Sequence, residues 1–371
     1  MKKKENFIKT FVILISVTLF SVSAFFFSDE FLSFGAKVAL FSLRAMLPHE
    51  NTVAEVSETT TAEVETTEKV TEKEEVRTVS AENAFSKTPD DILKLMEKEK
   101  ANSSKLKKDK SIIERQYINE GVTDKHGLVR MKNVNNTKVS LKDILEEKID
   151  LSVEKDKPAV LIFHTHTTET YQLLDVGFYP KGFQTRTNDK GKNMVRVGEA
   201  ICEEIEKAGF KVIHDKEIHD SKYTGAYGKS RETVESYMKK YPSIQITLDI
   251  HRDAIQNSDG TKIKPTAEIK GKKAAQIMII SGCQEEGNPI TNLPDWRYNL
   301  TFAVHLQQKL EEFFEGITRP LYFCPRSYNM NVSHCSLLVE VGSDSNTLEE
   351  AVYTGKCIGT AVAEILEEYE E

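Results

Sequence analysis

The sequence contains the run Val160-Leu161-Ile162-Phe163-His164-Thr165-His166-Thr167-Thr168-Glu169, in which four apolar residues lead into two histidines and a glutamate. A short apolar run that follows a charged segment and Pro158 predicts a buried strand. Open α/β sheets bind ligands just beyond the carboxyl ends of their strands, where these polar side chains lie. Two histidines, a glutamate and an open position for water make a common catalytic zinc site. We therefore predict that His166 and Glu169 converge on one zinc ion.

Two further strand-like runs supply the rest of such a site. Residues 244–250 deliver His251 at their carboxyl end, and residues 336–342 carry Glu340. An H-x-x-E string alone is common by chance, but three strand ends that offer His and Glu, His, and Glu match a mononuclear zinc hydrolase. Such an enzyme needs three protein ligands and a carboxylate that handles the proton of a water molecule. We predict His166, Glu169 and His251 as metal ligands and Glu340 as the catalytic residue.

Three neighbouring residues leave alternatives open. His164 lies two residues before His166, so both could share one side of an extended chain, and His164 could replace Glu169 as a ligand or contact the substrate. Arg252 could bind a substrate carboxylate as a bidentate fork or form a structural pair. Asp253 could orient a ligand histidine from outside the metal shell.

From about residue 156 onward the pattern alternates between strands and helices, which is typical of an α/β domain. Short connections and amphipathic crossovers predict a single twisted, mainly parallel sheet with helices on both faces. We expect strands at 160–163, 210–214, 244–250, 276–282, 321–323 and 336–342, and helices at 193–208, 230–241, 293–314 and 348–368.

The amino terminus predicts a membrane anchor over residues 1–30. Three lysines at 2–4 precede an uncharged apolar run at 11–27, near the lower limit for crossing a bilayer. These lysines favour an N-terminus in the cytoplasm, with the rest of the chain outside. A cleaved signal peptide is the competing interpretation, with a cleavage-site match at Val22-Ser23-Ala24. Residues 31–50 could lie along the membrane as an amphipathic segment.

Composition divides the remainder of the chain. Residues 51–110 are rich in Thr, Glu and Lys and predict a disordered linker, although 90–100 has a weak helical pattern. Residues 111–153 form a lead-in segment, and 154–371 form the catalytic domain.

Charge and cysteine content exclude two classes of protein. A net charge of -8 and a pI near 5.7 argue against a nucleic-acid partner. The five cysteines include no C-x-x-C pair, and an odd number leaves at least one thiol unpaired, so the chain is no disulfide scaffold. We expect the cysteines to be small buried hydrophobic residues.

The motifs together resemble the stage II sporulation protein P family. The resemblance covers residues 155 to 371 and rests on several motifs in the same order, and the predicted anchor fits the same family. These motifs are Phe163-His164-Thr165-His166-Thr167-Thr168-Glu169-Thr170, Asn193-Met194-Val195-Arg196-Val197-Gly198, Ser230-Arg231-Glu232-Thr233, Asp249-Ile250-His251-Arg252-Asp253-Ala254 and Val339-Glu340-Val341-Gly342.

The resemblance implies a zinc-dependent peptidoglycan hydrolase with an amidase-like or zinc-exopeptidase-like fold, active at the sporulation septum during engulfment. The family is related to N-acetylmuramoyl-L-alanine amidases and is credited with endopeptidase cleavage of cross-links. Its expected partners are a lytic transglycosylase, stage II sporulation protein D, and a polytopic membrane protein, stage II sporulation protein M. The expected location is the cell membrane, in a single pass with the catalytic domain outside the cytoplasm.

Two other functions remain open from the sequence. A non-catalytic module that binds peptidoglycan or a partner would be expected to lack one of the ligands, and none is missing. A zinc carboxypeptidase or endopeptidase acting on stem peptides would use the same residues for a different bond.

Overall fold

The computed structural model describes residues 85–285, 288 and 291–371. The chain divides into two units, Met1–Lys69 and Val70–Glu371, and every described residue belongs to the second. The predicted anchor at 1–30, the segment at 31–50 and the linker up to residue 84 lie outside the described residues.

The predicted single-pass membrane location is contradicted by the structure. No helix within the described part of the chain is long and apolar enough to cross a bilayer.

An eight-stranded sheet forms the centre of the fold, with the strand order β2-β3-β11-β10-β12-β7-β4-β6. Its neighbours β3–β11, β11–β10, β12–β7, β7–β4 and β4–β6 run parallel, whereas β2–β3 and β10–β12 are antiparallel. The strands span Asp124–His126 (β2), Val129–Asn133 (β3), Pro158–Phe163 (β4), Lys211–His214 (β6), Ile246–Asp253 (β7), Ile277–Gly282 (β10), Leu321–Cys324 (β11) and Cys335–Ser343 (β12).

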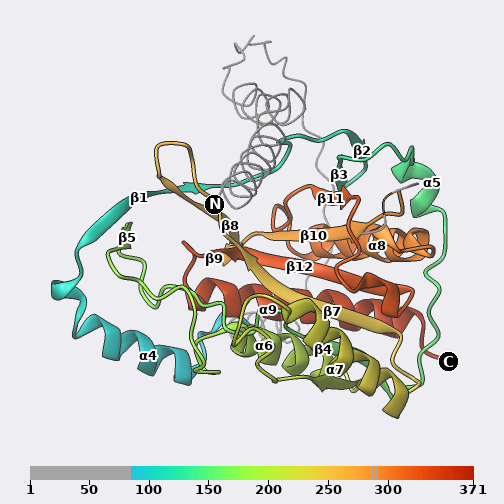
Figure 1. Ribbon diagram of the computed structural model, residues 1–371, viewed down its shortest axis with the longest axis horizontal. Coiled ribbons are helices and arrows are strands. Elements are labelled where there is room, and N and C mark those ends of the chain that lie inside the picture. Colours follow the sequence, from blue (N-terminus) through green and yellow to red (C-terminus); the bar gives the residue numbers. More distant parts are fainter. Residues whose placement is uncertain (1–84, 286–287, 289–290) are drawn as a thin grey trace, which may run out of the picture. The chain divides into compact units, whose positions relative to one another are not determined.

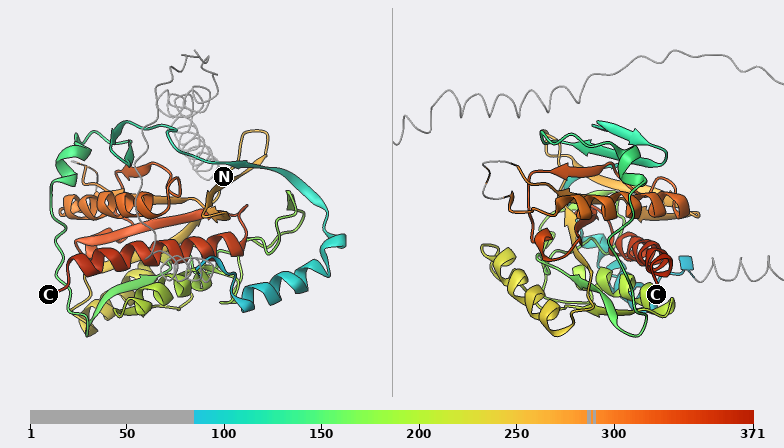
Figure 2. Two further views of the ribbon diagram at one scale, coloured as in Figure 1. Left: turned by 180° about the vertical axis from the view of Figure 1, so that it is seen from behind. Right: turned by 90° about the vertical axis from the view of Figure 1, so that its right-hand side faces the viewer.

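The strands β4, β7 and β12 are buried on both faces because helices cover both sides of the sheet. The helices α6 (Met194–Lys207), α8 (Trp296–Phe313) and α9 (Leu348–Glu368) share one core with alternate residues of these strands, such as Ile162 and Leu248. The opposite residues, such as Leu161 and Phe163, pack against α7 (Ala226–Lys240). Figure 2 shows the sheet between these two layers of helices.

The ends of α6 and α9 agree closely with the sequence prediction because their caps are local, whereas α7 begins four residues before its predicted start and α8 begins three residues after. Asn193 caps α6, since its side chain accepts a hydrogen bond from the backbone N–H of Val195. Thr347 and Glu350 form a reciprocal capping box at the start of α9.

The prediction of a single sheet is wrong, because a second sheet of four strands accompanies the first. Its order is β5-β1-β8-β9, and its strands are Phe178–Pro180 (β5), Lys108–Arg115 (β1), Lys262–Ile269 (β8) and Lys272–Ala275 (β9). The mixed α/β class stands, and Figure 1 shows β1 lying beyond the large sheet.

The end of the predicted linker is folded. The helix α4 (Asp90–Lys100) buries Ile92 completely in the main core, and Phe85 packs against the same core. The predicted lead-in segment also belongs to the domain, because β1 joins the small sheet and β3 pairs with β11 in the large one. Residues 85–153 are therefore part of one folded unit with the remainder of the described chain.

Candidate metal centre

The candidate centre lies where β4, β7 and β12 end. His251 is the register partner of Glu340 across β7 and β12, and Phe163 is the partner of Asp249 across β4 and β7. The turn after β4 then brings His166 and Glu169 to the same edge. His166, Glu169 and His251 are 8%, 7% and 3% exposed. The structure thus gathers the four residues predicted from three separate strand ends.

One pair of ligand atoms in this cluster already lies at a spacing that suits a shared ion. His251 Nδ1 lies 3.8 Å from Glu169 Oε2, and the imidazole rings of His166 and His251 are 5.2 Å apart between centroids. Zinc binds each nitrogen or oxygen ligand at about 2.0–2.2 Å, so two ligand atoms of one ion lie at most about 4.4 Å apart. The Nδ1 and Oε2 atoms satisfy that limit without movement.

Buried polar atoms without partners also fit a metal. His166 Nδ1 and Glu340 Oε2 are both buried without a hydrogen bond, which is costly unless a ligand completes the site. The His, Glu and His donors are of the type that zinc prefers. The ligand atoms of the predicted trio do not all lie within 4.8 Å of one another. Within the described residues, a different trio meets that criterion, namely Asp215, Glu217 and His219. The predicted ligands would therefore have to draw closer around an ion.

Asp249 is a site residue that the sequence reasoning missed. Its Oδ1 lies 2.9 Å from His251 Nε2 and accepts a hydrogen bond of 2.8 Å from the backbone N–H of Thr165. Burial favours the neutral imidazole, but the Asp249 carboxylate outweighs this and raises the pKa of His251 to about 9. Asp249 and His251 are two residues apart on one strand, so they share a face, and that period-two spacing was the available signal.

The environment of Glu340 suits proton transfer. Burial, followed by the nearby Asp253 carboxylate, raises the pKa of Glu340 to about 8. A carboxyl group with a pKa near neutrality can both accept and return a proton. Glu340 therefore has the electrostatic setting expected of a general base and acid.

A polar network holds the turn that carries His166 and Glu169. Asp220 accepts hydrogen bonds from the backbone N–H and the hydroxyl group of Thr168, at 3.0 and 2.7 Å. Arg186 forms ion pairs with both Asp220 and Glu169. Glu169 Oε2 also accepts a hydrogen bond from the backbone N–H of Arg252. Burial nevertheless raises the pKa of Glu169.

The three residues with open roles make other contacts. His164 is fully buried, and its nitrogens lie 3.0 Å from the carbonyl oxygen of Ile250 and 2.9 Å from His214 Nε2. Arg252 donates from Nε and Nη2 to the carbonyl oxygens of Thr170 and Thr185, both at 2.7 Å. These partners favour the structural alternative for Arg252 and leave His164 without a free nitrogen.

Asp253 does not hold a ligand histidine, contrary to one expectation. Its Oδ2 pairs with Arg319 at 2.9 Å, and its Oδ1 accepts the backbone N–H of Ala254. The carboxylate that faces His251 belongs to Asp249 instead.

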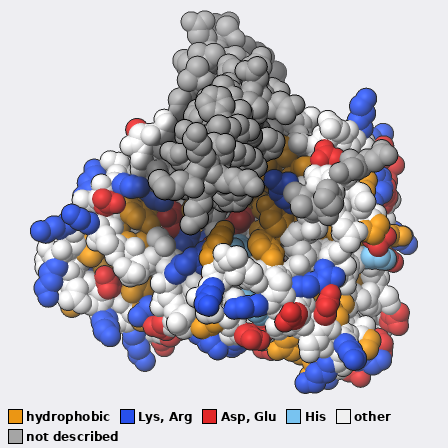
Figure 3. Space-filling model, viewed as in Figure 1, with side chains coloured by type: hydrophobic (Ala, Val, Ile, Leu, Met, Phe, Trp, Pro, Cys, Tyr) orange, Lys and Arg blue, Asp and Glu red, His pale blue; other side chains and the backbone are white. Residues whose placement is uncertain are grey.

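Aromatic side chains flank the two histidines. The exposed ring of Tyr223 stacks on His166 with centroids 4.7 Å apart, and Tyr227 stands edge-on to His166 at 5.7 Å. Tyr227 in turn contacts Tyr328. On the face seen in Figure 3, hydrophobic side chains gather around a hollow at the centre of the molecule.

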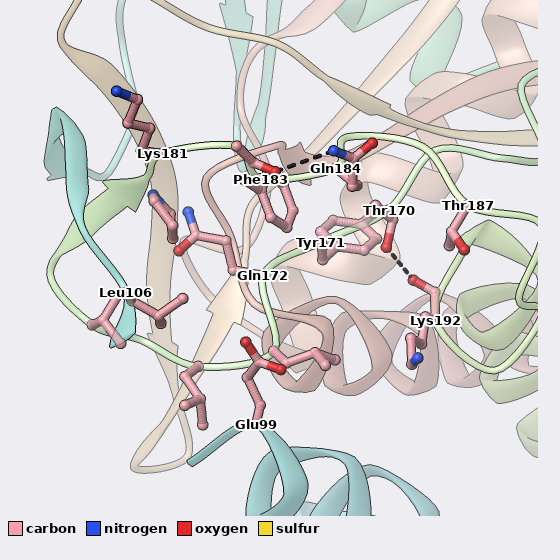
Figure 4. A pocket seen from close by; sticks show the side chains of 15 residues that line it. Glu99, Leu106, Thr170, Tyr171, Gln172, Lys181, Phe183, Gln184, Thr187 and Lys192 are labelled. Atoms are coloured by element: carbon pink, nitrogen blue, oxygen red, sulfur yellow. Dashed lines mark hydrogen bonds between the residues drawn. The ribbon is translucent and has the colours of Figure 1, made fainter. Parts of the chain in front are cut away.

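A pocket of about 400 Å³ is lined in part by residues that follow Glu169 in the sequence, beginning with Thr170. Figure 4 shows Glu99 reaching from α4 toward the segment that carries Tyr171 and Gln172. Gln172 is 4% exposed, and its buried Nε2 donates no hydrogen bond. The pocket is lined by Glu99, Leu106, Thr170, Tyr171, Gln172, Leu173, Leu174, Val176, Pro180, Lys181, Gly182, Phe183, Gln184, Thr187 and Lys192.

Comparison with known proteins gives a family match over most of the chain. A family model described as stage II sporulation protein P matches residues 40–364. The protein of that name from Bacillus subtilis (strain 168) is 27% identical over 207 residues, which are 53% of this chain and 48% of that protein. The chain thus aligns with about half the length of this curated relative.

Solved structures give weaker likenesses. The N-acetylmuramoyl-L-alanine amidase AmiC2 of Nostoc punctiforme is 12% identical, covers 57% of this chain and 96% of its own, and has a TM-score of 0.33. The CwlD amidase from Clostridioides difficile, in complex with the GerS lipoprotein, is 13% identical and has a TM-score of 0.35. The match covers 57% of this chain and 98% of that chain. Likenesses at these TM-scores carry no argument about function.

Proposed function

Because the chain belongs to the stage II sporulation protein P family, we propose that it is a zinc-dependent peptidoglycan hydrolase of sporulation. We further propose that it cleaves the amide bond between N-acetylmuramic acid and L-alanine, and also peptide cross-links. The observation that supports this most directly is the buried cluster of His166, Glu169 and His251, with the unpartnered Oε2 of Glu340 beside it.

Each residue has a defined task in this proposal. His166, Glu169 and His251 would hold the ion, which would supply a Lewis acid for the attack of water on the amide carbonyl. Glu340 would accept the proton of the attacking water and return it to the leaving amine. Asp249 would keep His251 oriented through Nε2, as carboxylates commonly do for ligand histidines.

The pocket beyond Thr170 would receive part of the peptide side of the substrate. Its lining includes Thr170, the residue after Glu169 in the sequence, and the unpartnered amide of Gln172 can donate to a peptide carbonyl or carboxylate group. Leu106 and Phe183 add apolar surface for side chains. Peptidoglycan is thus the proposed binding partner. The transglycosylase and the membrane protein expected from the family are proposed as protein partners.

The test compares zinc content and muropeptide release for the wild type with His166→Ala, His251→Ala and Glu340→Gln. We expect the histidine variants to lose zinc and activity, and Glu340→Gln to keep zinc but lose activity by at least 100-fold. Glu268→Gln, an exposed change on β8, is the matched control. Zinc-loaded wild type that binds sacculi but releases no product would overturn the proposal and favour a binding module.

Mass analysis of the products separates the two bonds. Intact muramic acid with released stem peptides means amidase activity, whereas split cross-links mean endopeptidase or carboxypeptidase activity. The same residues serve both reactions, so product masses decide between them.

A further inference from the structure

We propose a second metal site, outside the candidate catalytic centre, formed by Asp215, Glu217 and His219. This inference goes beyond the proposed function and uses none of its ligands. One ligand atom from each of the three side chains lies within 4.8 Å of the other two. The residues follow β6 in a segment without helix or strand, at spacings of two residues, which places all three on one side of an extended chain.

One ring nitrogen of His219 can offer an electron pair to a metal. Its Nδ1 lies 2.9 Å from the carbonyl oxygen of His164, and a carbonyl group can only accept, so Nδ1 carries the proton. In the neutral imidazole, Nε2 then carries an electron pair, which lies 3.2 Å from the hydroxyl group of Thr233, a partner that a metal would displace. A ligand histidine is commonly fixed in this way, by donating its other ring N–H to a carbonyl group.

The electron pair of His219 Nε2 also faces an acceptor. Asp215 Oδ2 lies 3.4 Å from His219 Nε2, is buried, and has no hydrogen-bond donor. Asp215 and His219 are 4% and 1% exposed, so water does not reach them freely. Two acceptors that face each other in a buried place repel unless a cation lies between them. A divalent ion satisfies both atoms at once.

Glu217 provides the third ligand and the route of entry. Its side chain is exposed, whereas the other two are buried. The hydroxyl group of Thr233 lies 3.3 Å from Glu217 Oε2 and 3.2 Å from His219 Nε2, so its single proton can be donated to only one of these two ligand atoms. One nitrogen and two carboxylate oxygens suit zinc, with water in the remaining position. Because the ligand atoms lie within 4.8 Å of one another, they would have to draw slightly closer to reach the separation of at most about 4.4 Å that one zinc ion allows.

An ion here would brace the turn that carries His166. The hydroxyl group of Thr167 donates to the carbonyl oxygen of Glu217 at 2.8 Å, and His219 donates to His164. The segment from Asp215 to Asp220 therefore packs against residues 164–168 from the side. The proposed ion is structural: it would hold this segment in place and would not contact the substrate.

The test is zinc stoichiometry and affinity of the full-length, metal-free protein. The variants are His251→Ala, which removes the candidate catalytic site, Asp215→Asn and the double change. We expect the wild type to bind two equivalents of zinc and each single variant to bind one. The double variant should bind zinc at least 10-fold more weakly than either single variant. Glu217→Gln in the His251→Ala background is a second probe that leaves the buried residues intact. Glu232→Gln, an exposed change on α7, is the control.

The outcomes separate this inference from the proposed function. If the wild type binds one equivalent and Asp215→Asn removes it, the second site stands although the catalytic centre has failed. The inference is overturned if His251→Ala binds no zinc. It is also overturned if adding Asp215→Asn or Glu217→Gln to His251→Ala leaves the zinc affinity unchanged. In both cases Asp215 and His219 form an ion pair only.

Discussion

At the scale of single residues, the candidate centre concentrates like charges in a buried place. Glu169, Asp249 and Glu340 all surround His251, and Asp253 adds a fourth carboxylate near Glu340. Asp249 keeps its charge, since His251 and the hydrogen bonds from Thr165 lower its pKa despite burial. Glu340 instead keeps its proton to a high pH. Repulsion between these carboxylates destabilises the metal-free protein, and a bound cation would relieve it.

Glu340→Gln is therefore expected to stabilise the metal-free protein at pH 8. The pKa of Glu340 is raised from 4.5 to about 8 in the folded protein. In the unfolded chain this carboxyl group loses its proton near pH 4.5, so the wild type loses stability as the pH rises from 4.5 to 8. The variant escapes this loss. Its advantage in unfolding free energy should grow over that range to the order of a few kcal/mol, because one pKa unit is about 1.4 kcal/mol.

Urea unfolding in the presence of a chelator, at pH 5 and pH 8, measures this difference. The exposed Glu268→Gln should show no such trend. An advantage for Glu340→Gln that is the same at both pH values would contradict the raised pKa.

The residues of the site were predictable where the signal was local. His166, His251 and Glu340 each follow or end an apolar run, and the structure gathers them at one sheet edge. Their roles as ligands and catalyst stay predictions. Asp220 and Arg186 could not be found in this way, because they reach the turn from separate loops, and only the folded chain brings them to Glu169.

At the scale of elements, the strongly periodic segments were predicted well and the small sheet was not. The predicted helix at 348–368 coincides with α9, and the strand at 160–163 lies within β4. The strand β8 contains Lys262, Lys264 and Pro265, which argue against a strand by composition. Long-range pairing with β1 and salt bridges to its lysines stabilise β8 instead.

The helix α4 is a second element whose composition misled the prediction, and Ile92→Ala tests its contribution to the fold. Sequence composition placed this helix in a linker, but Ile92 is fully buried in the main core. Truncating a buried isoleucine costs about 2–5 kcal/mol. Ile113→Ala on β1, where the side chain is 45% exposed, is the matched control and should cost less than about 1 kcal/mol. Urea unfolding of the full-length variants measures both. Equal effects would mean that α4 does not contribute to the folded unit.

At the scale of the whole molecule, Lys264 connects elements that lie far apart in the sequence. Its side chain is 1% exposed, and its Nζ lies 2.7 Å from Glu350 on α9, 2.8 Å from Asp175 and 3.1 Å from Glu114 on β1. Burial alone would lower the pKa of Lys264, but these carboxylates, Glu350 first, raise it well above its usual value. One buried cation thus joins the small sheet to the main core.

The confirmed family resemblance does not reveal this connection, because it depends on residues outside the site motifs. The five cysteines likewise contribute no cross-links, since all five are buried and free, as the sequence predicted. The small sheet therefore depends on non-covalent contacts for its attachment, and Lys264 is the most buried charged contact among them in the described chain.

Lys264→Met should destabilise the molecule by about 3–5 kcal/mol, because it leaves the buried carboxylate of Glu350 without its cation while nearly preserving side-chain volume. Lys229→Met, an exposed change on α7, is the matched control and should stay within about 0.5 kcal/mol of the wild type. Unfolding by urea can be followed by far-ultraviolet circular dichroism and by the fluorescence of Trp296, the single tryptophan. We expect the two signals to coincide, with a lower midpoint and an unchanged slope for Lys264→Met. A midpoint equal to that of Lys229→Met would mean that the small sheet is held by its backbone pairing alone.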